Sequence, residues 1–467
     1  MYTVATILTI VVLQHKASWA SNSRSCQMCE CKNSTITCVD VLIENQQQFN
    51  MTEDITTVHF TRTPIETIKN KFFTSENLQN ITWISSNIKK VESLDQKKLK
   101  YLDLSKNVIN ELSPDAFANC PQLEYIDLSN NRISYIPDNL FLETSMLKVL
   151  KLENNNFNAI PKHLFSNLEN LEYLNVADSG LYNISFGPLK NLRSIIISNS
   201  NNLSTIEEDS FSSTPNIEVI EINNCNKLQT LPNTIASLKN LKKLHMANTK
   251  MEVNCYNGWF MQWVNETNVI EGFEGYSDFV TNINKLDCPP KIYYTTGPVV
   301  FQLTENGTIE CKAYGNPYPA ITWLAPGGRT FHENKETDKN FTDHPKVHDW
   351  ENKPIYVPSI KTDLNGSMHI SRVLRDNIGN YTCYVSNIHG HDSQVVVLRL
   401  DSSVFFNIKI NAILLGLVSA IGFLMLTILC CAFKLLLIKM NCMKARKIPV
   451  ENELETVETE KHVPEQV

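Results

Sequence analysis

The residues with the clearest chemical potential are thirteen cysteines, which fall into groups by their spacing. The first group, Cys26, Cys29, Cys31 and Cys38, lies within a short N-terminal segment. Four thiolates this close could bind a zinc ion, or they could form two disulfides in an oxidising compartment. Because an export signal precedes them, we favour disulfides, and the sequence alone leaves three pairings open.

Four further cysteines either follow the sequence repeats or lie inside them. Cys255 and Cys288 flank a segment that follows the last sequence repeat described below. Cys120 and Cys225 lie inside the repeats, several repeats apart, so their Cα atoms should exceed the ~7 Å limit for a bridge. We therefore expect Cys120 and Cys225 to be buried free thiols.

Enzymatic chemistry has no comparable support. The closest histidine pairs are His344 with His348 and His389 with His391. His344 and His348 would converge on zinc only from a helix, and Pro345 argues against a helix there. Nucleophile-elbow, Walker and dinucleotide-binding motifs are absent from the sequence. We expect no catalytic activity, no metal site and no cofactor.

Repeated sequence segments predict the secondary structure that surrounds the cysteines. Strings that start at Leu99, Leu123 and Leu147 fit L-x-x-L-x-L-x-x-N-x-L, the leucine-rich repeat pattern. One such unit cannot bury its own apolar edge, so the units must stack into a solenoid with parallel strands on a concave face. The same frame gives about nine units, the others starting at Ile55, Leu78, Leu171, Leu192, Ile217 and Leu241.

Two further columns support this register. The residue six positions before most later starts is phenylalanine, as expected for a side chain that fills the convex half of each turn. Asn107, Asn131 and Asn155 keep the asparagine position, where the amide should satisfy buried backbone groups. The phenylalanine column comprises Phe72, Phe117, Phe141, Phe165, Phe186 and Phe211.

The strand positions between the framework leucines are candidates for partner binding. One column carries Tyr101, Tyr125 and Tyr173, and tyrosine suits an interface because it combines contact area with a hydroxyl. Tyrosine also fits any exposed strand, so a purely structural role remains the alternative. Neighbouring exposed columns are expected to carry Asp103, Asp127 and Lys151, and Ser105, Ser129, Glu153 and Ala177.

A second module follows residue 290. Cys311, Trp323 and Cys383 have the order of an immunoglobulin sandwich, in which a disulfide joins the two sheets and the tryptophan packs against it. Tyr381, two residues before the second cysteine, fits a tyrosine corner. The long interval between the two cysteines predicts a protruding polar loop within residues 329–355.

Topology is predicted by an apolar leader and one later apolar run. Residues 1–20 resemble a signal peptide, and residues 410–433 are uncharged and long enough to span a bilayer. Lysines and an arginine follow this run, which places the C-terminus in the cytoplasm by the positive-inside rule. All glycosylation sequons precede the span: Asn33, Asn50, Asn80, Asn183, Asn202, Asn265, Asn306, Asn340, Asn365 and Asn380.

Charge and tail composition limit the partners. The net charge of −7 and the lack of a basic run outside the juxtamembrane segment argue against nucleic acid. Residues 434–467 contain no tyrosine, and Glu465-Gln466-Val467 weakly resembles a PDZ ligand, although an acidic tail ending in valine by chance is the simpler interpretation.

Taken in order, these motifs resemble the LRR-Ig family of single-pass receptors, which includes the Kekkon, LINGO and AMIGO proteins. The resemblance implies a type I plasma-membrane protein active in adhesion or in modulation of other receptors. It also implies the bridges Cys26–Cys31 and Cys29–Cys38 in the first cap. In the second cap Asn257 replaces a family cysteine, which leaves one bridge, Cys255–Cys288, and a looser cap.

We therefore predict a multidomain chain: an α/β leucine-rich-repeat solenoid, an all-β immunoglobulin-like (I-set-like) sandwich and one transmembrane helix. The expected function is recognition or adhesion through extracellular or cell-surface protein partners, including a second copy of this chain. The alternative is modulation of another receptor in cis. The expected segments are 1–20 signal peptide, 21–54 first cap, 55–251 repeats, 252–290 second cap, 291–400 immunoglobulin-like domain, 401–409 linker, 410–433 span and 434–467 tail.

Overall fold

The computed structural model describes residues 24–43, 48–332, 360–401 and 403–445. The chain divides into two units, one that ends at Arg399 and one that begins at Leu400. The expected signal peptide, most of the polar loop with Asn340, His344 and His348, and the acidic tail lie outside the described residues.

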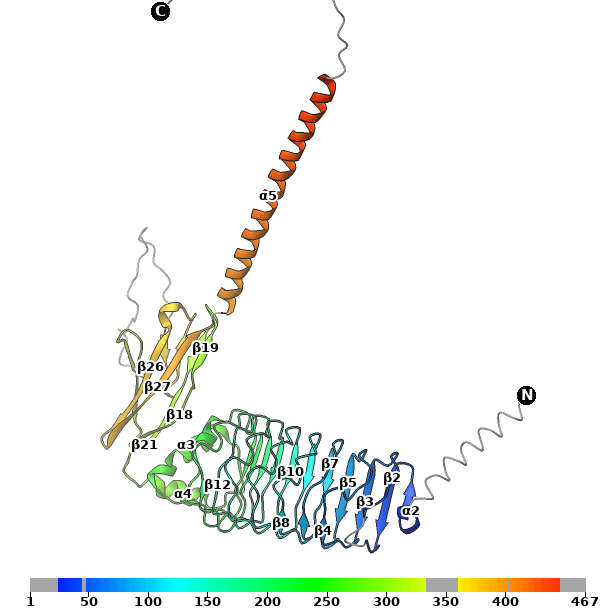
Figure 1. The fold of residues 1–467 in the computed structure, drawn as a ribbon. Coiled ribbons are helices and arrows are strands. Elements are labelled where there is room, and N and C mark those ends of the chain that lie inside the picture. Colours follow the sequence, from blue (N-terminus) through cyan, green and yellow to red (C-terminus); the bar gives the residue numbers. More distant parts are fainter. Residues whose placement is uncertain (1–23, 44–47, 333–359, 402, 446–467) are drawn as a thin grey trace, which may run out of the picture. The chain divides into compact units, whose positions relative to one another are not determined.

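The first unit is built around a sheet of twelve strands, which Figure 1 shows side by side along the solenoid. The repeat strands pair in parallel, and the N-terminal hairpin β1–β2 joins the same sheet. In sheet order, the strands are β1 (Glu30–Lys32), β2 (Thr35–Val39), β3 (Thr57–Thr61), β5 (Asn80–Ile84), β7 (Tyr101–Asp103), β9 (Tyr125–Asp127), β10 (Val149–Lys151), β11 (Tyr173–Asn175), β13 (Ser194–Ile196), β15 (Val219–Glu221), β16 (Lys243–His245) and β17 (Ile270–Glu271).

Each repeat strand begins two residues after the start of its leucine frame. The second residue of each repeat strand points into the core, and the residues on either side of it start on the outer face because side chains alternate along a strand. Leu102, Ile126 and Leu150 are accordingly fully buried. The frame read from the sequence therefore matches the register of the sheet.

The opposite side of the solenoid consists mainly of turns, with short strands and one 3-10 helix, η1 (Asn233–Ser237). The phenylalanine column is buried as expected, and the rings of Phe117 and Phe141 stack with 6.0 Å between centroids. The short strands are β4 (Thr67–Ile68), β6 (Lys90–Val91), β8 (Glu111–Leu112), β12 (Asn183–Ile184) and β14 (Thr205–Ile206).

The asparagine column joins successive turns, which confirms its expected role. The Asn107 side-chain amide donates to the carbonyls of Trp83 and Leu104, and its oxygen accepts from the backbone N–H of Ser86. Asn131 and Asn155 repeat this pattern in the next two turns. These bonds satisfy backbone groups that the turns would otherwise bury without partners.

One regular feature was not anticipated from the sequence. The residue seven positions after each frame start has a positive φ, between 49° and 61°, so each strand leaves the sheet through the left-handed region. Asparagine and aspartate tolerate this conformation best, and they dominate the later units. The residues are Arg62, Ser85, Lys106, Asn130, Asn154, Asp178, Asn199, Asn224 and Asn248.

Both ends of the solenoid are closed. The first end carries α2 (Arg24–Met28), and the second carries η2 (Cys255–Asn257), α3 (Gly258–Thr267) and α4 (Tyr276–Ile283). Trp259, Phe260 and Trp263 of α3 are buried over the last repeat, as the sequence predicts for a cap.

The immunoglobulin-like domain has a five-stranded sheet, ordered β19-β27-β26-β22-β23, and two smaller sheets, β18-β21 and β20-β25-β24. Trp323 is buried and donates its indole N–H to the Gly366 carbonyl, while the Tyr381 hydroxyl donates to the Asn377 carbonyl as a tyrosine corner requires. The elements are β18 (Cys288–Thr295), β19 (Val299–Phe301), β20 (Gly307–Ile309), β21 (Cys311–Asn316), β22 (Ala320–Leu324), β23 (Thr330–His332), β24 (Ile360–Thr362), β25 (Met368–Ile370), η3 (Arg375–Asn377), β26 (Gly379–Asn387) and β27 (Gly390–Leu400).

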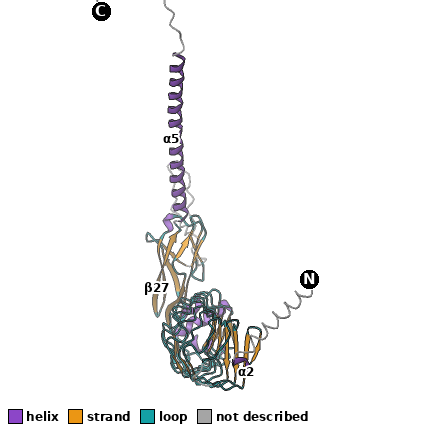
Figure 2. Cartoon of the chain, turned by 45° about the vertical axis from the view of Figure 1, so that its right-hand side comes forward, coloured by secondary structure: helices purple, strands orange, loops and turns teal. Residues whose placement is uncertain are grey.

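The second unit contains one long helix, α5 (Ser403–Ala445), drawn in purple in Figure 2. Its stretch Ile410–Met440 is long and apolar enough to cross a membrane. The stretch extends beyond residue 433 because the apolar residues 435–438 follow Lys434 before Lys439.

Candidate functional site

The outward side chains of β3, β5, β7, β9, β10, β11, β13, β15 and β16 form a continuous surface, which we call the strand face. Tyr101, Tyr125, Val149 and Tyr173 are paired residue by residue across β7, β9, β10 and β11. Asp103, Asp127, Lys151 and Asn175 form the next column in the same register. The structure thus aligns the six residues proposed from the sequence along two adjacent columns.

The centre of the strand face is an aromatic and charged cluster. The rings of Tyr101 and Tyr125 stack with their centroids 4.4 Å apart and their planes 11° from parallel. The Tyr125 hydroxyl donates to an Asp127 carboxylate oxygen at 3.2 Å, and the Lys151 ammonium lies 5.4 Å from the Tyr125 ring centroid. This ammonium is also 3.7 Å from an Asp127 carboxylate oxygen, so Lys151 contacts both Tyr125 and Asp127.

Burial also changes the acidity of this cluster. Partial burial raises the pKa of Tyr101 to about 12, with smaller contributions from Tyr125 and Asp103. Burial likewise raises the pKa of Tyr125, and the Asp127 carboxylate adds to that effect. Both phenols are therefore neutral at physiological pH and act as hydrogen-bonding contact surfaces rather than as proton carriers.

Two expectations about exposure were wrong. Asp127 is buried, because its carboxylate turns back to accept from the Ser129 backbone N–H at 2.9 Å as well as from Tyr125. In the third column Ser105, Ser129 and Ala177 are buried too, since the chain bends into the turn at that point.

Glu153 in this third column differs from its neighbours. It is half-buried, and its Oε2 atom is inaccessible to solvent yet has no hydrogen-bond partner among the described residues. Burial raises the pKa of its carboxyl, and the nearby Asp127 and Asp178 act in the same direction while Lys151 opposes them. The sequence contained only a hint of this site, namely a glutamate where the neighbouring units have serine or alanine.

The cysteines proposed as disulfides are joined in the structure as Cys26–Cys31, Cys29–Cys38, Cys255–Cys288 and Cys311–Cys383. Cys120 and Cys225 are free and buried, as expected. Burial raises the pKa of the Cys120 thiol to about 12 and that of Cys225 to about 11, so neither is a nucleophile in the folded chain.

Asn257 fills the position of the missing cap cysteine. It is fully buried, and its side-chain amide donates to the carbonyls of Gln229 and Glu252, both at 2.8 Å. Gln229 belongs to the last repeats and Glu252 to the start of the cap. The bond to Gln229 therefore ties the cap to the solenoid, and the bond to Glu252 holds the start of the cap, where the family pattern has a disulfide.

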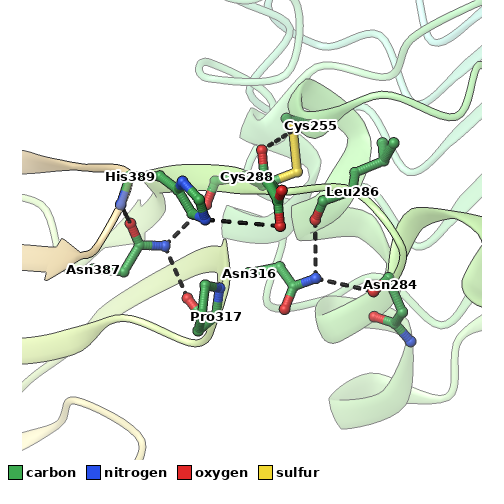
Figure 3. A network of polar contacts seen from close by, with 9 residues as sticks. Cys255, Asn284, Leu286, Cys288, Asn316, Pro317, Asn387 and His389 are labelled. Atoms are coloured by element: carbon green, nitrogen blue, oxygen red, sulfur yellow. Dashed lines mark hydrogen bonds and ion pairs between the residues drawn. A yellow bond between two sulfur atoms is a disulfide. The ribbon is translucent and has the colours of Figure 1, made fainter.

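A polar network connects the second cap with the immunoglobulin-like domain (Figure 3). The Asn387 side chain donates to the carbonyls of Cys288 and Pro317, and the Asn316 side chain donates to the carbonyls of Asn284 and Leu286. These contacts satisfy backbone carbonyls where β18 leaves the cap.

An apolar contact supports the same junction. Tyr314 of β21 is buried against Gly258, where a Cβ atom would lie 1.8 Å from the ring. Only glycine therefore permits this approach, and the junction between the domains is packed as well as hydrogen-bonded.

The other predicted positions are surface features. Each sequon asparagine in the described part of the chain is exposed or half-exposed, and Asn80 lies on the strand face opposite Tyr101. His389 is 3.8 Å from an Asp287 oxygen and His391 stacks on Tyr384. Among the described residues, no group of three or more His, Cys, Asp or Glu side chains is arranged to hold a metal ion.

Comparison with known proteins identifies both modules. Residues 86–133, 122–181, 145–203 and 190–251 match the leucine rich repeat family, and residues 289–387 match an immunoglobulin domain family. Leucine-rich repeats, an immunoglobulin domain and a candidate membrane-spanning helix on one chain define an LRR-Ig architecture. Domains of these two types are typical of non-enzymatic cell-surface adhesion and recognition proteins, and they generally mediate protein–protein interactions.

Neural cell adhesion molecule 1 is among the similar curated proteins. The Gallus gallus protein is 25% identical over 134 residues, which are 28% of this chain and 10% of that protein. The Homo sapiens protein is 26% identical over 132 residues, which are 28% of this chain and 15% of that protein. The matched part of the chain thus spans only 10–15% of the length of these relatives.

Similar solved structures include the Drosophila Toll–Spatzle complex and the neural ectodermal development factor IMP-L2. The Toll–Spatzle match has 20% identity and a TM-score of 0.41, and covers 44% of this chain and 30% of that chain. The IMP-L2 match has 20% identity and a TM-score of 0.18, and covers 24% of this chain and 43% of that chain.

Proposed function

We propose that this chain is a type I cell-surface recognition protein that binds a protein partner through the strand face of its repeats. The observation that carries the proposal is the cluster around Tyr101 and Tyr125, which combines aromatic area, hydroxyls and charge on a sheet face that the described residues leave uncovered. Half-buried tyrosines flanked by polar groups are the residues that most often dominate protein interfaces.

A new glycan on the strand face tests this assignment. The paired changes Val149→Asn and Lys151→Thr create a sequon at the centre of the face, and a bulky glycan there should abolish attachment of partner cells. The matched control is Leu142→Asn, which creates a sequon with the existing Thr144 on an exposed turn of the neighbouring unit. Both variants must reach the cell surface, which an antibody to the ectodomain reports.

The outcomes separate the candidate elements. Loss of attachment with the strand-face glycan alone supports the proposal. Equal attachment by both glycosylated variants would overturn it and leave the immunoglobulin-like domain as the binding element. If partner cells never attach but a second receptor on the same cell is captured through the strand face, the chain acts as a modulator in cis.

The orientation has its own test. We propose that the described ectodomain lies outside the cell and that the segment after α5 lies inside, because basic residues follow the apolar stretch. An epitope tag after Val467 should be stained only after permeabilisation, and staining of intact cells would contradict this orientation.

A further inference from the structure

The charges along the edge of the long sheet neutralise one another. In the residues that immediately precede the strands, Lys148 lies 2.7 Å from Glu124, and Glu218 contacts both Arg193 and Lys242. Acidic and basic residues alternate along this row from Lys100 to Lys242, and five of them form ion pairs with the neighbouring unit. This edge offers a charged partner little net attraction.

The strand face itself is different. Its two lysines already have partners, because Lys151 pairs with Asp127 and Lys243 lies 3.2 Å from Glu271. Asp103, Glu153 and Glu221 have no ion-pair partner among the residues that the structure describes. The unpaired charge of the face is therefore negative, and Asp103 carries part of it beside the tyrosine pair.

Two carboxylates along the tyrosine column, Asp103 and Glu153, carry charge that no ion pair neutralises among the described residues. One oxygen of Asp103 accepts from the Ser105 backbone N–H at 2.9 Å, and the structure assigns no partner to the other oxygen. The Glu153 side chain is half-buried, and one of its oxygen atoms has no hydrogen-bond partner among the described residues, so this group contributes uncompensated charge to the face. An acceptor without a donor is costly in a partly dry setting, so a cationic donor placed there gains more than it would on an open surface.

We propose that the strand face between β7 and β10 binds an arginine-containing segment of a protein partner, with guanidinium groups lying against Tyr101 and pairing with the carboxylates of Asp103 and Glu153. The inference rests on the proposed function and adds the chemistry of the partner to it. Arginine suits the site better than lysine, since a planar guanidinium stacks on aromatic rings and donates in parallel to a carboxylate.

Peptide binding to the full-length chain tests this chemistry directly. The chain is placed in nanodiscs of phosphatidylcholine, which carries no net charge, and the probe is a short labelled peptide of alternating glycine and arginine. Peptides with lysine or glutamate in place of arginine serve as comparisons. Fluorescence anisotropy should rank the affinities arginine first, lysine second and glutamate last.

A double variant shows where the peptide binds. Asp103→Ser with Glu153→Gln keeps an oxygen acceptor for the Ser105 N–H, removes both charges and creates no glycosylation sequon, and it should weaken binding of the arginine peptide by at least about tenfold, equal to roughly 1.4 kcal/mol. The matched control, Asp138→Ser with Glu143→Gln, makes the same chemical changes at exposed residues of one neighbouring unit and should leave the affinity unchanged.

The partner chemistry is overturned if the arginine peptide does not bind, if lysine or glutamate peptides bind as tightly, or if the double variant behaves like its control. Each of these results can be distinguished from a failure of the proposed function, which the glycan variant tests separately. If the glycan at residue 149 blocks cell attachment while the double variant attaches normally, the strand face binds a partner and only its arginine chemistry is wrong.

Discussion

Tyr101 and Tyr125 lie on adjacent parallel strands with their rings stacked, 4.4 Å between centroids. Each ring therefore covers part of the other, and the pair stabilises the sheet in addition to offering contact area. A surface with such internal contacts is held in place before a partner arrives, which lowers the entropic cost of binding. The same contacts mean that truncating these tyrosines affects folding as well as recognition.

The stacking predicts a measurable coupling between the two tyrosines. In a double-mutant cycle with Tyr101→Leu and Tyr125→Leu, the free energies of unfolding should be non-additive by about 0.5–1.5 kcal/mol. Urea unfolding of the single and double variants measures this quantity. The control cycle pairs Tyr101 with Tyr173, which is separated from it by two intervening strands, and additive effects are expected there.

The convex column predicts a large loss of stability on truncation. Phe141 is 1% exposed and stacks on Phe117, so Phe141→Ala should cost about 3–5 kcal/mol and reduce export to the cell surface. Leu142, the next residue, is 54% exposed, and Leu142→Ala should change the unfolding free energy by less than about 0.5 kcal/mol. Similar unfolding curves for the two variants would show that Phe141 does not fill the core.

The second cap should depend on Asn257 as other caps depend on a disulfide. Asn257→Ala removes the side-chain donor to the carbonyls of Gln229 and Glu252, which should cost about 0.5–1.5 kcal/mol. Limited proteolysis should then cut within residues 252–290 before it cuts the repeats. Asn282→Ala, on the exposed surface of α4, is the control, and an identical digestion pattern would argue against this role of Asn257.

The repeats were predictable because their signal is redundant. Leucine spacing, the phenylalanine column and the asparagine column each fix the same register, so an irregular unit is placed by its neighbours. The tyrosine column followed from that register, as did the pairing of Tyr101 with Tyr125. The immunoglobulin-like domain was recognisable from Cys311, Trp323 and Cys383 because its core needs a disulfide and an adjacent tryptophan.

The side-chain chemistry of the strand face was less predictable. Alternation along a strand assigns Asp127 to the surface, but its carboxylate turns inward to a backbone N–H, and the pattern contains no information on that choice. The burial of Glu153 depends on where the chain bends into the next turn. The hydrogen bonds of Asn257 join residues 28 and 5 positions apart, so a single missing cysteine suggested a looser cap rather than a replacement contact.

Glu153 should make the stability of the repeats depend on pH. Its carboxyl has a raised pKa in the folded chain because burial disfavours the charge. At neutral pH the carboxyl is ionised without penalty in the unfolded chain. In the folded chain, burial makes the ionised form unfavourable, so the group lowers the unfolding free energy. This penalty disappears as pH falls through the raised pKa towards the ordinary value of a glutamate, where both states bind the proton.

Glu153→Gln should therefore raise the melting temperature at pH 7, and the gain should shrink as the pH is lowered to about 5. Because the side chain is only half-buried, solvent screening limits the gain to about 1 kcal/mol, or roughly 2–4 °C. Thermal unfolding at several pH values measures it, with Glu143→Gln at an exposed position as the control. A gain that is independent of pH would show that the charge of Glu153 is not the cause, and a loss of stability would show that its carboxylate has a favourable partner. The same carboxylate would then be unavailable to a guanidinium, so this measurement also bears on the arginine-binding role of the strand face.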